Sequence, residues 1–477
     1  MRTLRPGFAG LLALGIFAIT ADSASAQTLA KQLEPYRKTA NEPGAARGQL
    51  TEFRDLKLAL GNPTPADKAV FEQMSQYLVN RVTHHEYHAT TPEPADLKPR
   101  PADKTVNELI NELRKFLIVP PADGKITLPQ EDYIRELGIA LDKSLTAILI
   151  TEKGKVPPPP IIRVNAGRML AVACESGAPA HWPTVIGLLK NPETPPELLY
   201  SALKASEGLL GGFDISRLSR LAPGPEAAEG ILYELVHALE EIVLKGPPIL
   251  SKVYIESGSQ PILATDPKVR PATLHPEQVV AVQLYRLQAI RALARLRNDT
   301  LGGKVKPSFE VRPVFTLARV AIGDPAISPA LNKKEVAEAV IGLSRINPGA
   351  NLNTDELTYA ISYGLRIVFS AKATNAEDTS ISWKGYAARL NAALLDWQAL
   401  CAKNPRVTQK QKDSINSLVK KANDGLFAPV LNPTAGTGGM NLVKLELIDD
   451  WQRDNQPIND RQLFSDTKSF KLVYGAK

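Results

Sequence analysis

The stretch between residues 163 and 210 limits the fold of this chain more than any other part of the sequence. Apolar residues recur in it at helical spacing, and the pattern breaks at Gly177–Pro183 and at Asn191–Pro196. This spacing predicts helix, turn, helix, turn, helix. Each predicted helix is too short, and too apolar on one side, to be stable alone. The stretch must therefore pack against further helices.

Prolines divide the rest of the chain into similar short segments. The 477 residues include 38 prolines, about 8% against an average of about 5%. Because proline fixes φ and removes a backbone donor, such clusters are expected between helices rather than inside them. The clusters lie at residues 92–101, 157–160, 192–196, 247–248 and 267–276.

The run Pro157–Pro160 predicts a stiff spacer, since a polyproline helix has no internal hydrogen bonds. It separates an N-terminal helical region with proline-rich linkers, residues 27–156, from a more regular helical region, residues 157–424. The remaining residues, 425–477, are rich in loops and are expected to form a small irregular or β-containing tail.

Apolar periodicity predicts the individual elements. Within the tail, Asn441–Ile448 and Ser469–Tyr474 alternate in polarity, as strands do. Further helices are expected at about residues 49–60, 66–88, 106–116, 130–150, 225–245, 278–297, 312–322, 332–346, 354–371, 383–403 and 407–423.

One short motif returns within residues 157–424: an alanine, a small or flexible residue three positions later, and a leucine directly after that. Copies begin at Ala166, Ala205, Ala289 and Ala339, and their leucines lie 39, 84 and 50 residues apart. A unit of about 40 residues is the period of stacked helical hairpins. The four alanines are therefore expected to be packing positions in the core.

The residues around these copies resemble HEAT and armadillo repeats. The best match to the second helix of a HEAT unit is formed by Arg286, Ala289, Ala292, Leu293 and Leu296. A second match is formed by Arg163, Ala166, Met169 and Leu170. The segment Trp182–Leu189, followed by Asn191-Pro192, is similar to the first helix of a HEAT unit and the turn after it.

The match has interruptions, because Ala202 and Val336 stand where the other two copies would carry the arginine. The resemblance covers about residues 161–346. It implies an all-α fold of stacked helical hairpins, an α-solenoid, for the middle of the chain.

Helix 278–297 has two predicted apolar faces. At about 100° per residue, the wider face is formed by Val282, Tyr285, Ala289, Ala292, Leu293 and Leu296. A second patch is formed by Leu287, Ile290 and Ala294, whereas Gln288, Arg291 and Arg295 are expected to point away from both. A helix that is sandwiched between neighbours requires two such faces.

The first 26 residues have the layout of a secretory signal peptide. Arg2 and Arg5 precede an apolar run over Phe8–Thr20, and Ala24-Ser25-Ala26 forms a small-residue cleavage site. No later stretch is long and apolar enough to span a membrane. The sequence predicts a bacterial-type protein exported to the periplasm or the exterior, without a membrane span after cleavage.

Cysteine usage and charge restrict the chemistry. Cys174 and Cys401 are the two cysteines, too few for a disulfide scaffold. Export permits a bond between them, but the apolar surroundings of Cys174 favour a buried free thiol. The net charge of +7 is compatible with acidic surfaces or polysaccharides, while export argues against nucleic acid.

The densest cluster of metal-ligand side chains is formed by His84, His85 and His88. On a helix, His84 and His88 would share a face, as zinc-binding pairs do. The metalloprotease pattern requires a glutamate directly after the first histidine and a second histidine four residues after it. Neither His84 nor His85 satisfies both conditions, so a polar helix end with adventitious metal affinity is favoured. The sequence contains no catalytic or cofactor-binding signature.

Arg286, Arg291 and Arg295 make helix 278–297 basic. If several repeats display arginines on one surface, a protein or an anionic glycan could bind there. A solvated helix face is the plain alternative.

These observations favour an exported, non-enzymatic binding or scaffold protein whose helical-repeat surface binds a protein or glycan partner. Two alternatives stay open. One is a helical-toroid enzyme acting on polysaccharide, with a site assembled from residues distant in sequence. The other is a metal-binding protein that uses the histidine cluster.

Overall fold

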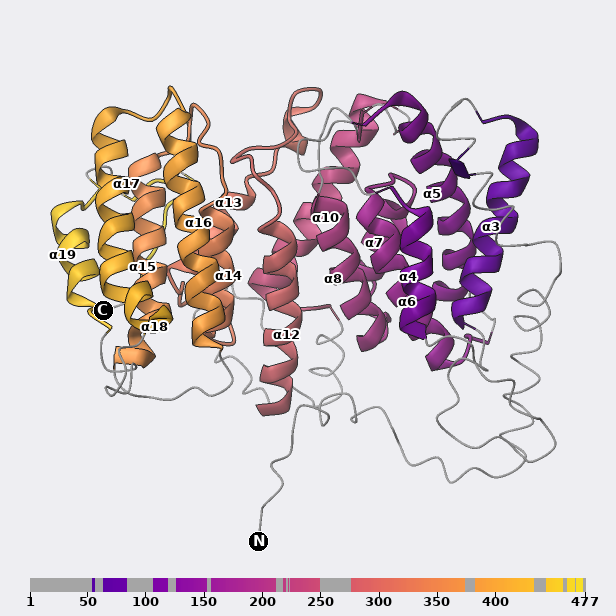
Figure 1. The fold of residues 1–477 in the computed structure, drawn as a ribbon, viewed down its shortest axis with the longest axis horizontal. Helices are drawn as coiled ribbons and strands as arrows, with labels where there is room; N and C mark the ends of the chain where they lie inside the picture. The colour runs from indigo at the N-terminus through magenta and orange to yellow at the C-terminus, as the bar shows by residue number, and fades with distance from the viewer. Residues whose placement is uncertain are drawn as a thin grey trace, which may run out of the picture.

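The computed structural model describes most of the chain from residue 63 onward (Figure 1). The described residues are 54–55, 63–83, 106–118, 126–151, 156–211, 218–219, 222, 224–248, 276–373, 382–432, 443–457, 461–467 and 469–474. The predicted signal peptide, residues 1–26, and nearly all of the predicted helix 49–60 lie outside these ranges.

The described residues are all-α. The helices are α3 Pro65–Thr83, α4 Val106–Phe116, α5 Leu128–Leu149, α6 Pro160–Ala173, α7 His181–Lys190, α8 Pro196–Gly211, α10 Pro225–Lys245, α12 Pro276–Leu293, α13 Pro313–Ala321, α14 Lys333–Leu343, α15 Thr354–Ala373, α16 Trp383–Lys403, α17 Gln409–Ala422, α18 Ala428–Leu431 and α19 Glu446–Asp454. A π-helical turn, Asn423–Phe427, joins α17 to α18.

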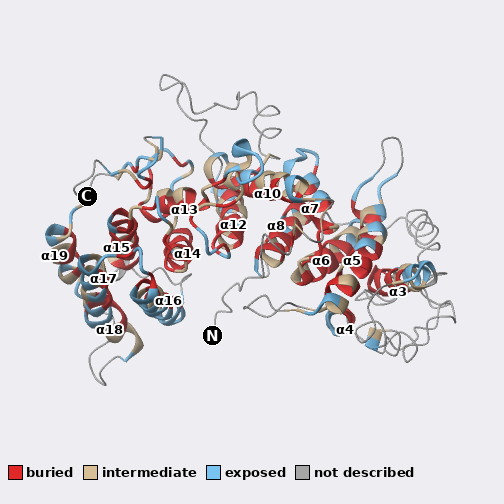
Figure 2. Ribbon diagram, turned by 90° about the horizontal axis from the view of Figure 1, so that it is seen from above, coloured by how far each residue is buried: buried red, intermediate tan, exposed pale blue. Residues whose placement is uncertain are grey.

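These helices form two rows. In an inner row, α4, α6, α8, α12, α14 and α16 each pack against the next, and in an outer row α3, α5, α7, α10, α13 and α15 do the same. Helices that follow one another in the sequence also contact each other across the two rows: α5 with α6, α7 with α8, α10 with α12, and α13 with α14. Figure 2 shows both rows bent into an arc, with the inner row on its concave side.

Local signals explain where the helices begin and end. The predicted bounds of α4, α10 and α16 are confirmed to the residue. Helix α5 begins at a capping box: the Thr127 side chain accepts from the Gln130 backbone N–H, and the Gln130 side chain accepts from the Thr127 backbone N–H. Asn332 and Glu335 form the same pair of bonds at the start of α14. Such boxes satisfy amides that have no partner in the first turn.

The predicted packing positions are confirmed. Ala166, Ala205, Ala289 and Ala339 are all fully buried, each on a helix between its row neighbours. A methyl side chain at these points lets the backbones of two helices approach closely. The buried free thiol expected at Cys174 is also confirmed, and Cys401 is likewise free and buried.

Two expectations are wrong. The described part of the tail contains no strand: residues 446–448 begin helix α19, which buries Ile448 and Trp451, and residues 469–474 form only an isolated bridge, between Gln462 and Lys471. The alternation of polarity that ends at residue 448 reflects the single buried stripe of helix α19. Gln288 is buried rather than solvated, because α8, α10 and α14 all pack around α12.

Helices on both sides of Pro157–Pro160 pack together. α6 contacts α3, α4 and α5, and α5 also contacts α7. Buried apolar side chains form one connected core from Phe71 to Leu472. No helix in the described part of the chain is long and apolar enough to cross a membrane.

Candidate functional site

Arg286 lies inside the protein rather than on its surface. Its Nε donates to Glu335 Oε1 at 2.5 Å and its Nη2 donates to Glu335 Oε2 at 2.9 Å. Its Nη1 donates to the Pro329 carbonyl at 2.7 Å. Both charged side chains have no exposed surface. The pair joins α12 to α14, and Arg286 has no surface on which to meet a partner.

Arg291, one turn and a half further along α12, is half-buried and contacts Glu338 of α14. Glu338 Oε1 accepts from Arg291 Nη2 at 2.9 Å and from Arg389 Nη1 at 2.8 Å. Its Oε2 accepts from Arg389 Nη2 at 2.6 Å, and the Tyr386 hydroxyl lies 3.4 Å from Oε1. A single carboxylate from α14 thus joins guanidiniums of α12 and α16.

Glu338 is unsuited to acid–base chemistry. Burial on its own would raise its pKa, but the hydrogen bond from Arg389 and the charge of Arg291 outweigh burial and lower it. A general acid or base at neutral pH requires a pKa near 7 and an accessible lone pair. Glu338 has neither, because its side chain is 2% exposed and both oxygens are occupied.

Arg295 is exposed at the end of α12 and contacts α8. Its Nη2 donates to Glu207 Oε1 at 2.6 Å, and Lys204 Nζ donates to Glu207 Oε2 at 3.1 Å. Burial opposes ionisation of Glu207, but these two cations lower its pKa. One carboxylate again serves two cations.

Arg345 follows the last turn of α14 and differs from the arginines around it. It is half-buried, yet its side chain forms no ion pair or hydrogen bond with any residue that the structure describes. Burial lowers the pKa of its guanidinium, and the charges of Arg295, Arg389 and Arg297 lower it further. The negative charge of Asp396, an exposed side chain, opposes this effect and raises the pKa of Arg345.

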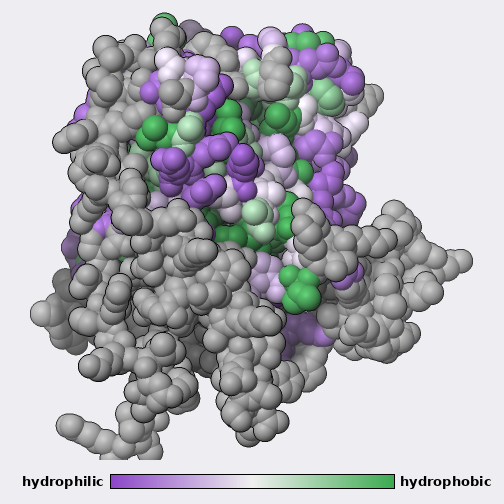
Figure 3. Space-filling view, turned by 90° about the vertical axis from the view of Figure 1, so that its right-hand side faces the viewer, coloured by the Kyte–Doolittle hydropathy of each residue, from purple (hydrophilic) through white to green (hydrophobic). Residues whose placement is uncertain are grey.

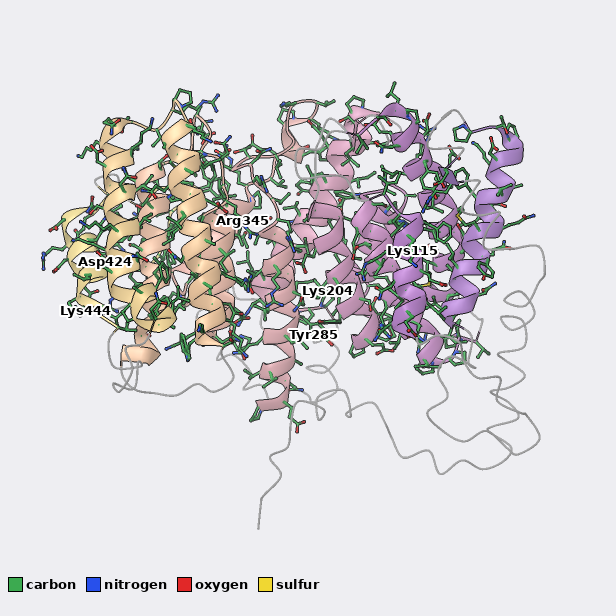
Figure 4. The ribbon with its side chains drawn as sticks, viewed as in Figure 1. Lys115, Lys204, Tyr285, Arg345, Asp424 and Lys444 are labelled. Carbon is green, nitrogen blue, oxygen red and sulfur yellow. The ribbon has the colours of Figure 1, made fainter. Side chains whose placement is uncertain are left out.

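The cations of this region outnumber the carboxylates that face them. We call the following six side chains the inner-row basic cluster: Lys204, Arg291, Arg295, Arg297, Arg345 and Arg389. The acidic groups coupled to them are Glu207, Glu338 and Asp396. Among these nine side chains the cations outnumber the carboxylates by three. Figure 4 shows Lys204 and Arg345 on either side of α12.

Sequence reasoning identified Arg291 and Arg295 but missed Arg345, Arg389 and Lys204. A signal for Arg345 was available, since Arg295 and Arg345 both lie two residues after the leucine of the alanine–leucine motif. Both helices also end in the same way: Arg295 N donates to the Ala292 carbonyl and Arg345 N donates to the Gly342 carbonyl. The two arginines are therefore equivalent positions of successive hairpins. Arg389 and Lys204 have no such signal.

The other sequence candidates do not form a site among the described residues. His84, His85 and His88 lie outside the described ranges. The part of the chain that the structure describes contains no group of three or more His, Cys, Asp or Glu side chains arranged to hold a metal. His181, at the start of α7, is fully buried with Nδ1 3.2 Å from Asp142 Oδ1.

A second surface feature is an open groove of about 890 Å³ on the outer row. It lies between α7 and α10 and is lined mainly by apolar and glycine residues, Phe309 among them. Glu234, on its wall, is already paired with Lys190 at 2.5 Å. The α3 end of the molecule, in contrast, shows hydrophobic and hydrophilic side chains mixed where they are visible (Figure 3).

No protein-family model, curated protein or solved structure matches this chain.

Proposed function

We propose that this protein is a non-enzymatic binding or scaffold protein, a HEAT-like α-solenoid whose concave inner row binds an acidic macromolecule. The observation that carries the proposal is the grouping of cations on the inner row, where Glu207 and Glu338 each accept from two cations and the six members of the inner-row basic cluster outnumber the three carboxylates coupled to them. Excess charge on a concave surface attracts oppositely charged partners and accelerates their association.

The packing pattern supports the solenoid. From α5 to α14, each α-helix contacts its partner in the hairpin and the equivalent helices of the hairpins before and after. That is the connectivity of repeat proteins, which use extended concave surfaces for binding. The equivalent positions of Arg295 and Arg345 support a repeated unit on the same surface.

The charge pattern supports a polyanionic partner over a single small metabolite. The cations lie on α8, α12 and α16 or just beyond the ends of α12 and α14, so they extend across four neighbouring inner helices. An acidic protein segment and an anionic glycan both carry charges at repeated intervals. The proposal also includes export through the signal peptide at residues 1–26, which predicts a mature N-terminus at Gln27.

Binding to immobilised polyanions tests the proposal. The mature chain is passed over a sulfated polysaccharide, poly-glutamate and neutral dextran, in a series of salt concentrations. We expect binding to at least one polyanion that weakens as salt rises, because salt screens exposed charges, and no binding to dextran. The polyanion that binds more tightly distinguishes a glycan partner from a protein partner.

A charge-neutralising variant locates the surface. Lys204→Gln with Arg297→Gln removes two cations, and we expect affinity for the polyanion to fall about tenfold. Lys444→Gln removes one exposed cation near α19 and is expected to leave affinity unchanged. Equal affinity of both variants, or binding to none of the polyanions at low salt, would reject the proposed function.

A further inference from the structure

The exposed face of α12 is apolar in its first half and basic in its second half. Side chains that lie three or four residues apart form one stripe of a helix. The members of this stripe are Val280, Leu284, Leu287, Arg291 and Arg295. Val280 and Leu284 are exposed apolar side chains, and Arg295 is exposed at the other end. The stripe therefore presents an apolar surface followed by two guanidiniums.

The position of the neighbouring helices explains why the apolar part of the stripe is exposed. The Tyr285 hydroxyl donates to the carbonyl of the first residue of α8 at 3.3 Å. Gln283 Nε2 donates at 3.2 Å to the Ala330 carbonyl, three residues before α14. Val280 therefore lies before both inner-row neighbours begin, and Figure 1 shows this end of α12 extending beyond them.

Helix α8 has the same order of apolar and basic side chains. It runs beside α12 in the same direction, because its first residue contacts Tyr285 and Glu207, near its end, accepts from Arg295 at 2.6 Å. Tyr200 exposes its ring one turn before Lys204. In Figure 4, Lys204 lies above Tyr285. The apolar ends of the two helices thus lie on the same side of the inner row.

The cations of this surface lie above the carboxylates that they contact. The side chains of Arg295 and Lys204 are 44% and 34% exposed, whereas Glu207, which accepts from both, is 18% exposed. Glu338 is 2% exposed, and the two guanidiniums bonded to it are 29% and 49% exposed. Each carboxylate contacts two cations and lies beneath them, so the surface that a partner meets is basic.

We infer that the inner row binds an amphipathic, acidic segment of a protein. The apolar part of the segment packs on Val280, Leu284 and Tyr200. Its carboxylates pair with Lys204 and Arg295. Amphipathic helices bind in this way through apolar anchors three or four residues apart, and exposed apolar patches mark such contacts. The inference rests on the proposed function, because it concerns the same surface and selects a protein partner over an anionic glycan, which has no apolar side chains.

Three probes test the inference by fluorescence anisotropy with the full mature chain. The first is a peptide with leucines at helical spacing in its first half and glutamates in its second half. The second peptide has glutamine in place of every leucine, and the third probe is the sulfated polysaccharide. We expect the leucine peptide to bind at least about tenfold more tightly than the glutamine peptide, because it buries apolar surface in addition to pairing charges.

A single variant locates the apolar contact. Leu284→Gln should weaken binding of the leucine peptide about tenfold and leave binding of the polysaccharide unchanged, since no charge is removed. Ile139→Gln is the matched control, because it replaces an exposed apolar side chain on α5, in the outer row, and should bind like the natural protein. Circular dichroism verifies that both variants are folded. Unchanged affinity of Leu284→Gln for the leucine peptide would overturn the inference.

Other occupants of the apolar stripe give different results. A second copy of this chain on the stripe would produce an oligomer in sedimentation that Leu284→Gln dissociates without any peptide. Residues 249–275 of the same chain on the stripe would make Leu284→Gln lower the unfolding temperature while peptide affinity stays unchanged. Either result overturns the inference.

The probes also separate this inference from the proposed function. Equal affinity for the leucine and glutamine peptides, together with salt-sensitive binding of the polysaccharide, overturns the inference and leaves the proposed function standing. Binding of the leucine peptide that depends on Leu284, by a protein that binds no polyanion, supports the inference and rejects the proposed function, in which charge alone suffices.

Discussion

Arg286 and Arg345 lie on neighbouring inner helices and show how surroundings decide the role of an arginine. Arg286 forms hydrogen bonds with Glu335 of α14. Its charge is therefore used in the contact between two neighbouring hairpins. Arg345 has three other guanidiniums as its main charged neighbours. The same kind of side chain joins two helices in one place and has no ion-pair partner among the described residues in the other.

Removing the guanidinium of Arg286 should be costly. Arg286→Met leaves Glu335 as a buried charge without its partner, and we expect the free energy of unfolding to fall by about 3–5 kcal/mol. Arg366→Met is the control, since the pair of Arg366 with Asp449 at 2.5 Å is partly exposed and is expected to contribute less than about 1 kcal/mol. Urea unfolding measures both, and similar losses would contradict this account.

Glu356 gives stability a dependence on pH. It is fully buried, its Oε1 accepts from the Tyr474 hydroxyl at 2.6 Å, and burial raises its pKa to about 7. The folded protein therefore holds a proton that the unfolded chain releases between about pH 4.5 and 7. The stability due to this group is present below pH 4.5 and is lost as the pH rises through 7.

Glu356→Gln should remove the part of the pH dependence that Glu356 contributes. The natural protein should lose unfolding free energy between pH 5 and pH 8.5. In Glu356→Gln we expect this loss to be smaller by up to about 3 kcal/mol. Glu446→Gln, which changes an exposed carboxylate in the first turn of α19, should follow the pH profile of the natural protein. Identical profiles for natural protein and Glu356→Gln would show that Glu356 is not the titrating group.

At the scale of elements, two kinds of local feature define the hairpins. A turn with an Asn or Asp followed by proline comes after α7, α13 and α16. In each turn the side-chain oxygen accepts a hydrogen bond of 2.9 Å from the backbone N–H two residues later, at Asn191, Asp324 and Asn404. The proline after each of these residues prevents the helix from continuing. Small residues then set how closely the helices approach, as at Gly342.

Gly342 and Gly187 provide a matched test of helix contact. A Cβ at Gly342 would lie 2.7 Å from the Cβ of Ala294, whereas a Cβ at Gly187 would meet nothing within 4 Å. We expect Gly342→Ala to destabilise the protein by about 1–3 kcal/mol through overpacking. Gly187→Ala should stabilise it by about 0.5–1 kcal/mol, because alanine favours the helix. Thermal unfolding measures both variants. A change of stability in the same direction for Gly342→Ala and Gly187→Ala would contradict this account.

At the scale of the whole molecule, the helices from α5 to α14 pack mainly within their own hairpin and against the neighbouring hairpins. α14 contacts α12, α13, α15 and α16, whereas α5 contacts α3, α6 and α7. Stability in such an arrangement is close to a sum of each unit and its nearest neighbours. The two ends of the arc are therefore expected to respond separately to local changes.

Hydrogen exchange can detect this separation. In Gly342→Ala, amide exchange should accelerate in α12 to α15 and remain unchanged in α5, since no direct contact connects α5 to α14. The measurement is made under native conditions by mass spectrometry. Uniform acceleration along the chain would indicate one cooperative unit instead.

The amino-acid sequence by itself determined the helices and their packing positions. Periodicity, proline clusters and caps are local signals, so α4, α10 and α16 were predicted to the residue and Ala289 was predicted as core. The tail was wrongly predicted as strand because residues 441–448 are too few to distinguish a period of two from a helical stripe.

Only the tertiary structure decided which charges are available. Arg286, Arg291 and Arg295 look alike in the sequence, but their carboxylate partners lie 49, 47 and 88 residues away along the chain. Arg345 is half-buried with other guanidiniums as its main charged neighbours, which no local pattern in the sequence indicates. The physical reason is that charge compensation depends on distance and burial in space, and a local sequence pattern contains neither.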